Sequence, residues 1–208
     1  MKKLAILGAS GHGKVIADAA LLAGWKEIIF FDDKWPMLTK ISHWDVIGDS
    51  RSLIEQKGNY DGVIVGIGAN SIRLEKIKNL LRANIPVVSI VHPAATISPY
   101  AFLAVGTVVL ANAVVNIDAR CGLGCIINTS ASVDHDCMIG DGVHISPGAH
   151  LAGNVQIGNL SWIGIGASVR QKIVIGSEVI VGAGAAVVES IADNWTVVGV
   201  PAKLKLNK

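Results

Sequence analysis

The segment INTSASVDHDCMIGDGVHISPGAHL (residues 127–151) decides the fold, because an aliphatic or other apolar residue returns at every sixth position. The same period continues in both directions through Ile97, Leu103, Val109, Val115, Cys121, Ile127, Val133, Ile139, Ile145, Leu151, Ile157, Ile163, Val169, Ile175, Val181 and Val187. The positions four residues later hold small or β-branched residues, from Ala101 to Ile191. This pattern predicts a triangular parallel coil with one hexad on each flat side and about 18 residues per turn.

Glycines recur directly after the aliphatic positions of the repeat, at Gly122, Gly140, Gly158, Gly164, Gly176 and Gly182. We expect them to give the corners of the coil the backbone freedom that tight turns need. The cysteines, Cys121, Cys125 and Cys137, fall on inward positions of the repeat, which favours a packing role over a chemical one.

The chain before His92 follows a different pattern, in which short apolar runs alternate with stretches of helical spacing. The predicted strands are Leu4–Leu7, Ile28–Phe31, Val63–Ile67 and Val87–Val91, and the predicted helices are Val15–Leu22 and Ile72–Leu81. We therefore expect an α/β domain with a small parallel Rossmann-like sheet in residues 1–91, followed by an all-β domain in residues 92–208.

The overall composition limits the class of partner. The net charge is +2 and only 16% of the residues are charged, so neither nucleic acid nor an anionic membrane is the expected partner. No apolar run is long enough to span a bilayer. The three cysteines lack a CxxC spacing, which argues against structural zinc or a disulfide framework and favours the cytoplasm.

A glycine-rich loop, Gly8-Ala9-Ser10-Gly11-His12-Gly13, follows the first predicted strand and opens a helix. Backbone N–H groups and the helix dipole at such a point can bind phosphate. Asp32 and Asp33 end the second strand, where an acidic residue can meet a ribose. The spacing is Gly-x-x-Gly-x-Gly and differs from the dinucleotide motif. One alternative interpretation is a dinucleotide dehydrogenase, but no candidate set of hydride-transfer residues follows the loop. A second alternative is a purely structural glycine turn.

His135-Asp136 is a polar pair on an otherwise apolar repeat, two residues past the inward Val133. Imidazole titrates near neutrality, and an adjacent carboxylate fixes its tautomer, so the pair is a candidate general base. A solvated surface histidine between two acids is the alternative. One coil of about 18 residues beyond His135 is Gly153, which should lie roughly 5 Å away, and we expect its backbone N–H to stabilise an oxyanion.

The repeat and the closing Gly199-Val200-Pro201-Ala202-Lys203 resemble the hexapeptide-repeat acyltransferases, which are left-handed β-helices that assemble as trimers. The whole chain is similar to a narrower group, the sugar O- and N-acetyltransferases with a small N-terminal nucleotide-binding domain, and within it to the UDP-4-amino-sugar N-acetyltransferases of bacillosamine biosynthesis. The motifs that carry this resemblance are the glycine-rich loop, Phe31-Asp32-Asp33, Ile67-Gly68-Ala69-Asn70, Ile127-Asn128-Thr129-Ser130, Val133-Asp134-His135-Asp136-Cys137 and Ala152-Gly153-Asn154-Val155.

The resemblance implies a role for each matching position. His135 is the general base, and the acid after it assists, although that acid is glutamate in the bacillosamine enzymes, so Asp134 remains an alternative to Asp136. Asn128 joins the catalytic set. Acetyl-CoA is the co-substrate, no metal is required, and the implied coenzyme contacts are His144, Ile165, Gly182 and Ala183. The implied contacts of the nucleotide sugar are Ser10, Gly11, His12, Asp32, Asp33 and Gly68.

Coil arithmetic places His135 and the coenzyme residues on different sides of the triangle, because Ile165 lies 30 residues beyond His135. If both sets serve one reaction, the site forms between protomers of a homotrimer. The resemblance implies acetyl transfer to the 4-amino group of a UDP-linked amino sugar in bacterial glycan biosynthesis. The alternatives are O-acetylation of sialic acid or a related sugar, and a non-enzymatic scaffold or carbohydrate-binding module.

Overall fold

The computed structural model describes residues 2–205 of the chain, which divides into two compact units, Met1–Pro93 and Ala94–Lys208. The sequence pattern placed this division two residues earlier, after Val91. Among the described residues, no helix is long and apolar enough to cross a membrane.

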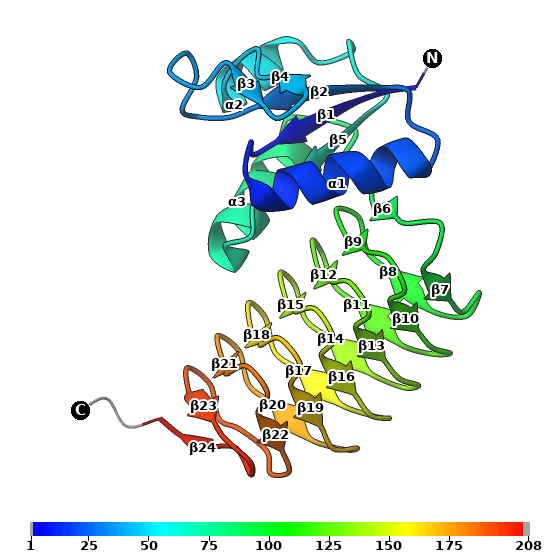
Figure 1. The fold of residues 1–208 in the computed structure, drawn as a ribbon, viewed down its shortest axis with the longest axis vertical. Helices are drawn as coiled ribbons and strands as arrows, with labels where there is room; N and C mark the ends of the chain where they lie inside the picture. The colour runs from blue at the N-terminus through cyan, green and yellow to red at the C-terminus, as the bar shows by residue number, and fades with distance from the viewer. Residues whose placement is uncertain (1, 206–208) are drawn as a thin grey trace. The chain divides into compact units, whose positions relative to one another are not determined.

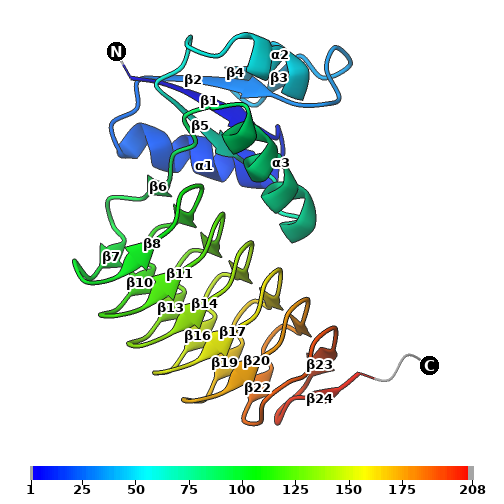
Figure 2. The same cartoon turned by 180° about the vertical axis from the view of Figure 1, so that it is seen from behind.

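The first unit is built on a parallel sheet with the strand order β2-β1-β5, as Figures 1 and 2 show. Its strands are β1 (Lys3–Leu7), β2 (Glu27–Phe31) and β5 (Gly62–Val65), and its helices are α1 (Gly11–Leu22), α2 (Ser50–Glu55) and α3 (Asn70–Arg82). Helix α1 packs on β1 and β2, and α3 packs on β5. Because the central strand β1 is covered on both faces, residues 4–7 are almost completely buried.

Two features of the first unit differ from the sequence-based expectation. The predicted strand Val87–Val91 is wrong as a continuous element: Val87 forms an isolated bridge to Val63, and β6 is only Ile90–Val91. Helix α2 and the hairpin of β3 (Lys40–Ile41) and β4 (Trp44–Asp45) were not predicted. These segments are too short for a hydrophobic period to identify them.

The second unit is the predicted parallel β-helix, with three flat faces of two- and three-residue strands (Figure 1). The β9 face contains β9 (Val108–Val109), β12 (Ile126–Ile127), β15 (His144–Ile145), β18 (Trp162–Ile163), β21 (Ile180–Val181) and β23 (Thr196–Val198). The β10 face contains β7 (Thr96–Ile97), β10 (Val114–Val115), β13 (Ser132–Val133), β16 (His150–Leu151), β19 (Ser168–Val169) and β22 (Ala186–Val187). The β11 face contains β8 (Phe102–Leu103), β11 (Arg120–Cys121), β14 (Met138–Ile139), β17 (Gln156–Ile157) and β20 (Val174–Ile175). A final strand, β24 (Lys203–Leu204), pairs antiparallel with β23.

The 18-residue coil is confirmed by the strand register, in which Val115 pairs with Val133 and Val133 with Leu151. The aliphatic positions of the repeat point into the coil, and all except Ile97 and Leu103 are buried. The second inward positions are buried as well, apart from Ala101. The three cysteines are buried thiols, as the packing interpretation predicted.

The prediction about the corner glycines is wrong. The left-handed backbone falls two residues further on, at Gly124, Gly142 and Gly166, and at non-glycine residues such as Asp136, with φ of 59°. Gly122 and its equivalents are needed for a different reason, since a Cβ on Gly122 would lie 2.6 Å from the Asp141 carboxylate and 2.8 Å from the next coil's backbone. These glycines therefore permit close stacking of successive corners.

Candidate active site

His135 and Asp136 lie on the corner between β13 and β14, which we call the base edge (residues 134–137 and 152–155). Both side chains are about half exposed, and His135 Nδ1 lies 2.7 Å from Asp136 Oδ2. This contact places the proton of a neutral imidazole on Nδ1 and leaves Nε2 as the basic nitrogen. The hydrogen bond to Asp136, reinforced by the nearby charges of Asp134 and Asp136, raises the pKa of His135 above its ordinary value.

Asp134 has different hydrogen-bond partners from Asp136. Its Oδ1 accepts hydrogen bonds from the His135 backbone N–H and from Asn116 Nδ2, each at 2.8 Å. These two hydrogen bonds lower the pKa of Asp134. Of the two acids that the sequence left open, Asp136 therefore contacts the imidazole, while Asp134 braces the backbone of the corner.

Gly153 lies against the imidazole of His135, one coil further along the base edge. A Cβ built on Gly153 would overlap the ring at Nε2 and Cε1, so only glycine lets the imidazole take this position. Asn154 N–H donates to the His135 carbonyl at 2.8 Å, which ties the two coils together. The hydrogen bonds found among residues 2–205 give the Gly153 N–H no acceptor.

The predicted coenzyme residues lie on another corner, between the β9 and β10 faces, which we call the Asn128 edge (residues 128–131, 146–149, 164–167 and 182–185). Ile165, Gly182 and Ala183 lie on this edge, and His144 is in β15 beside it. Gly184 N–H donates to the Ile165 carbonyl at 2.8 Å, so residues 165 and 183 lie in adjacent coils of the same column.

Asn128, the fourth residue of the predicted catalytic set, lies apart from His135 in the single chain. Asn128 lies on the Asn128 edge, where its Nδ2 is 3.1 Å from His144 Nε2. The whole width of the β10 face separates this edge from the base edge. Within one chain, His135 and Asn128 therefore do not meet.

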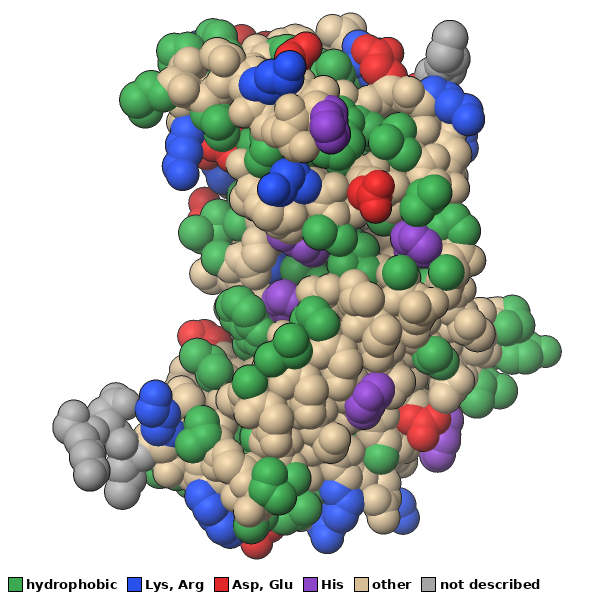
Figure 3. All heavy atoms as spheres, viewed as in Figure 1, with side chains coloured by type: hydrophobic (Ala, Val, Ile, Leu, Met, Phe, Trp, Pro, Cys, Tyr) green, Lys and Arg blue, Asp and Glu red, His purple; other side chains and the backbone are tan. Residues whose placement is uncertain are grey.

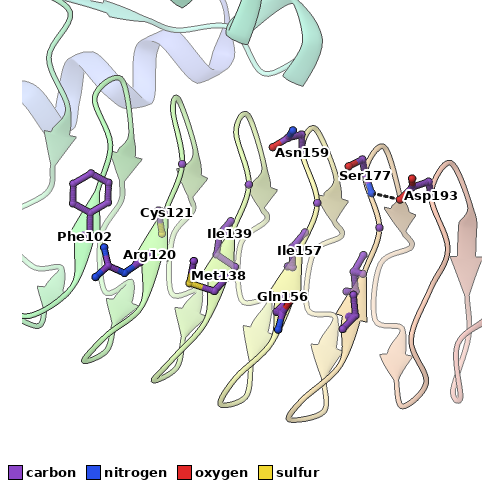
Figure 4. Close-up of a pocket in the computed structure, with 16 residues that line it drawn as sticks. Phe102, Arg120, Cys121, Met138, Ile139, Gln156, Ile157, Asn159, Ser177 and Asp193 are labelled. Carbon is purple, nitrogen blue, oxygen red and sulfur yellow. Dashed lines mark hydrogen bonds between the residues drawn. The ribbon is translucent and has the colours of Figure 1, made fainter.

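Two hollows flank the base edge. The groove on the β11 face has a volume of about 580 Å³ and is lined by the apolar side chains of Phe102, Met138 and Val174 together with Arg120 and Gln156. Figure 4 shows Phe102, Arg120, Met138 and Gln156 in a row along the face. The smaller hollow, about 370 Å³ on the β10 face, has Asn116, Ser132, Asp134 and His150 in its wall. His135 thus lies on the ridge between these two hollows.

Sequence reasoning missed two aromatic neighbours of these sites. Trp162 stacks on His144, with ring centroids 4.9 Å apart and an interplanar angle of 25°. His150 Nδ1 lies 2.9 Å from Ser132 Oγ. The coil period is the signal that identifies both pairs, because Trp162 and His150 each follow their partner by 18 residues in the strand register.

The glycine-rich loop of the first unit has two kinds of glycine. Gly8 has a φ of 116°, and a Cβ on Gly13 would overlap the Gly8 carbonyl, so both are required by the packing of α1 against the loop. Gly11, the first residue of α1, has no atom within 4 Å of the position of a Cβ. Packing therefore explains Gly8 and Gly13 but leaves Gly11 open for contact with a ligand.

Asp32 and Asp33 already bind donors of the protein. Asp32 accepts from the Ala9 N–H at 2.8 Å and from the Lys34 N–H at 2.9 Å. Asp33 Oδ2 lies 2.6 Å from Lys76 Nζ. Burial opposes ionisation of Asp33, but the hydrogen bonds from Lys76 and Ser50 lower its pKa to about 2. Both acids thus fix the loop at the carboxyl end of β2.

The remaining predicted substrate residues surround this end of the sheet. Ser10 Oγ donates to the Gly66 carbonyl at 3.1 Å, and a Cβ on Gly68 would meet no atom within 4 Å. Burial, together with the charge of Arg73, lowers the pKa of His12 to about 4. His12 is therefore a neutral imidazole near pH 7, able to donate one hydrogen bond.

Within residues 2–205, no group of three or more His, Cys, Asp or Glu side chains is arranged to hold a metal ion. On the face drawn in Figure 3, the basic side chains of the described residues are dispersed among acidic, polar and apolar ones.

Comparisons of the sequence and of the structure with known proteins point to the same family. Residues 3–80 match the PglD N-terminal domain family. The acetyltransferase domain of PglB from Neisseria gonorrhoeae, solved in complex with acetyl coenzyme A, is 43% identical over 98% of this chain and 99% of that one, with a TM-score of 0.94. The chain belongs to the hexapeptide-repeat sugar N-acetyltransferases.

Other relatives of this acetyltransferase chain act on different nucleotide sugars. Perosamine N-acetyltransferase from Caulobacter crescentus, solved with CoA and GDP-perosamine, is 33% identical over 99% of this chain and 98% of that one, with a TM-score of 0.93. UDP-N-acetylbacillosamine N-acetyltransferase from Bacillus subtilis is 37% identical over 114 residues. That match spans about half of the relative, 52% of its length, and 53% of this chain.

The Asp136→Asn variant tests the pairing on the base edge. If His135 is the general base, it must be deprotonated to act; because Asp136 raises the pKa of His135, wild-type activity should then fall as the pH drops through a value above the ordinary histidine pKa of 6.5. Removing the carboxylate should move this acidic limb of the kcat/KM profile to lower pH and reduce the maximal rate. Asp118→Asn is the matched control, since Asp118 has the same left-handed corner backbone one coil earlier. An unchanged profile in Asp136→Asn would contradict the assignment.

Proposed function

We propose that the chain transfers the acetyl group of acetyl-CoA to the 4-amino group of a nucleotide-linked amino sugar, with His135 as the general base. The observation that carries the proposal is the contact of His135 Nδ1 with Asp136, which leaves Nε2 basic on an exposed ridge beside Gly153. The relatives named above support acetyl-CoA as donor and an amino sugar as acceptor. The buried thiols are compatible with a proposed cytoplasmic location.

The proposed reaction is a direct transfer without a covalent enzyme intermediate. The sugar amine attacks the thioester carbonyl, and its proton passes to His135 Nε2. The Gly153 N–H donates to the oxyanion of the tetrahedral intermediate. The C–S bond then breaks, and the departing thiolate takes the proton from the imidazolium to give coenzyme A. Asp136 stabilises the imidazolium formed between the two proton transfers.

The proposed site is shared between two protomers of a trimer. The base edge and the Asn128 edge of one chain lie on opposite sides of the β10 face, so the two sets of residues cannot contact one reacting atom within that chain. A threefold arrangement in which the base edge of one chain meets the Asn128 edge of the next would combine them. His135 would come from one protomer and His144, Ile165, Gly182 and Ala183 from its neighbour.

For the acceptor, we propose that the first unit binds the nucleoside diphosphate. The open Cβ position of Gly11 and the N–H groups at the start of α1 form an anion-binding end of the helix. Ser10 and the neutral His12 add hydrogen bonds, and Gly68 leaves space beside them. Asp32 and Asp33 shape the nucleoside pocket by fixing its loop. A UDP-linked sugar is favoured by the bacillosamine-pathway relative.

Thiol release from acetyl-CoA in the presence of a UDP-4-amino-4,6-dideoxy sugar tests the reaction. His135→Ala should lower kcat by about 10²- to 10⁴-fold, the usual contribution of a general base. Thermal unfolding should change little, because the His135 side chain is 55% exposed. Wild-type activity on free sialic acid, without activity on the UDP-sugar, would contradict the proposed acceptor.

Mixed trimers test the shared site. Chains carrying His135→Ala and chains carrying Ala183→Trp, which fills the Asn128 edge, should each be inactive alone. After the two are unfolded together and reassembled, mixed trimers should recover part of the activity, because some sites combine a wild-type base edge with a wild-type Asn128 edge. Failure to recover activity in demonstrably mixed oligomers would exclude a site shared in this way.

Two glycine variants test phosphate binding at the start of α1. Gly11→Val should raise KM for the nucleotide sugar at least severalfold without a large change in melting temperature, because its Cβ position is open. Gly13→Ala should instead destabilise the fold by about 1–3 kcal/mol, because its Cβ overlaps the Gly8 carbonyl. Unchanged nucleotide-sugar affinity in a folded Gly11→Val protein would argue for a purely structural loop.

A further inference from the structure

We propose that Trp162 is a positioning residue of the transferase site, which holds His144 in the orientation and tautomer that accept a hydrogen bond from Asn128. The inference deepens the proposed function and rests on it for the catalytic consequence. The contacts among Trp162, His144 and Asn128 do not depend on which substrate is bound.

The orientation of the Asn128 amide is fixed by the backbone. The Thr129 N–H donates to Asn128 Oδ1 at 2.8 Å. A backbone N–H is an obligatory donor, so the amide oxygen must face it, and the NH₂ group must point the other way. Asn128 Nδ2 is thereby directed at His144 Nε2, 3.1 Å away.

This geometry determines the tautomer of His144. Because Asn128 Nδ2 can only donate, His144 Nε2 must accept, and a neutral ring then carries its proton on Nδ1. A proton on Nε2 would set two donors against each other. His144 is 7% exposed, so water does not readily replace this hydrogen bond.

Trp162 holds the imidazole from the next coil. The strand register pairs Trp162 directly with His144, and the indole stacks on the ring with a centroid separation of 4.9 Å. The indole is anchored in turn, since its Nε1–H donates to Ser146 Oγ at 2.7 Å. Ser146 is 4% exposed and lies two residues beyond His144 on the same corner. Trp162 therefore contacts both ends of the segment 144–146 in the preceding coil.

The consequence for catalysis concerns the second N–H of the Asn128 amide. One N–H is used by His144, and the half-buried Asn128 keeps its second donor on the edge that we assign to the acyl donor. A rigid amide N–H directs a carbonyl oxygen more effectively than a freely rotating one, because no orientation has to be found during the reaction. Trp162 thus acts on the substrate only through His144 and Asn128.

The tautomer of His144 is measured directly by long-range ¹H–¹⁵N correlation NMR on the intact protein. Wild type should show a protonated Nδ1 and an unprotonated Nε2. In Trp162→Ala both nitrogens should move toward the averaged signals of two exchanging tautomers, whereas Trp162→Phe, which keeps a stacked ring, should retain most of the wild-type pattern. Val174→Ala is the control, because Val174 is an outward strand residue of similar exposure on the β11 face. A wild-type pattern in Trp162→Ala would overturn the proposal.

Kinetics test the link to Asn128. Trp162→Ala should lower kcat/KM by about 2- to 10-fold, the range expected from loss of one aromatic stack. In Asn128→Ala the Trp162 substitution should have almost no further effect, since both changes break the same chain of contacts. Full additivity would overturn the positioning role. The NMR result stands even if no acetyl transfer is detected, so failure of the proposed function is distinguished from failure of this inference.

Discussion

Parallel stacking of 18-residue coils is the constraint on which the rest of the second unit depends. Strand pairing places each outward side chain directly beside the residue one coil away, at the spacing of neighbouring strands. The polar contacts of the site follow this rule: Asn116 bonds Asp134, and Ser132 bonds His150, both across 18 residues. The stack of Trp162 on His144 and the contact of Gly153 with His135 have the same origin.

The triangular cross-section imposes a second consequence. A face of two-residue strands separates the base edge from the Asn128 edge, and no rearrangement of side chains closes that distance while the coil remains intact. A rigid β-helix therefore cannot complete the proposed site within one chain. We infer that oligomer assembly completes the proposed site, because the β-helix of a neighbouring protomer can place its Asn128 edge against the base edge.

In the first unit, the same residues that suggest nucleotide binding also hold the unit together. Gly8 and Gly13 permit close packing, and Asp32 and Asp33 bind Ala9, Lys34, Ser50 and Lys76. Gly11 is different, since neither packing nor backbone conformation requires a glycine there. Most glycines of this loop are therefore required by the fold. The proposed phosphate contact rests on Gly11, whose Cβ position is open.

The sequence by itself determined the β-helix, its 18-residue coil and its inward residues, because a six-residue hydrophobic period repeated many times leaves little choice of fold. It also identified the exposed polar pair His135-Asp136. Only the tertiary structure decided which acid contacts the imidazole, since Asp134 and Asp136 are equally close in sequence and differ only in backbone conformation and partners. The place of Asn128, the stacking of Trp162 and the reason for the corner glycines likewise depended on contacts between coils. A local pattern fixes the period of a solenoid, whereas the chemistry on its surface is set by side-chain directions and hydrogen bonds that the pattern does not contain.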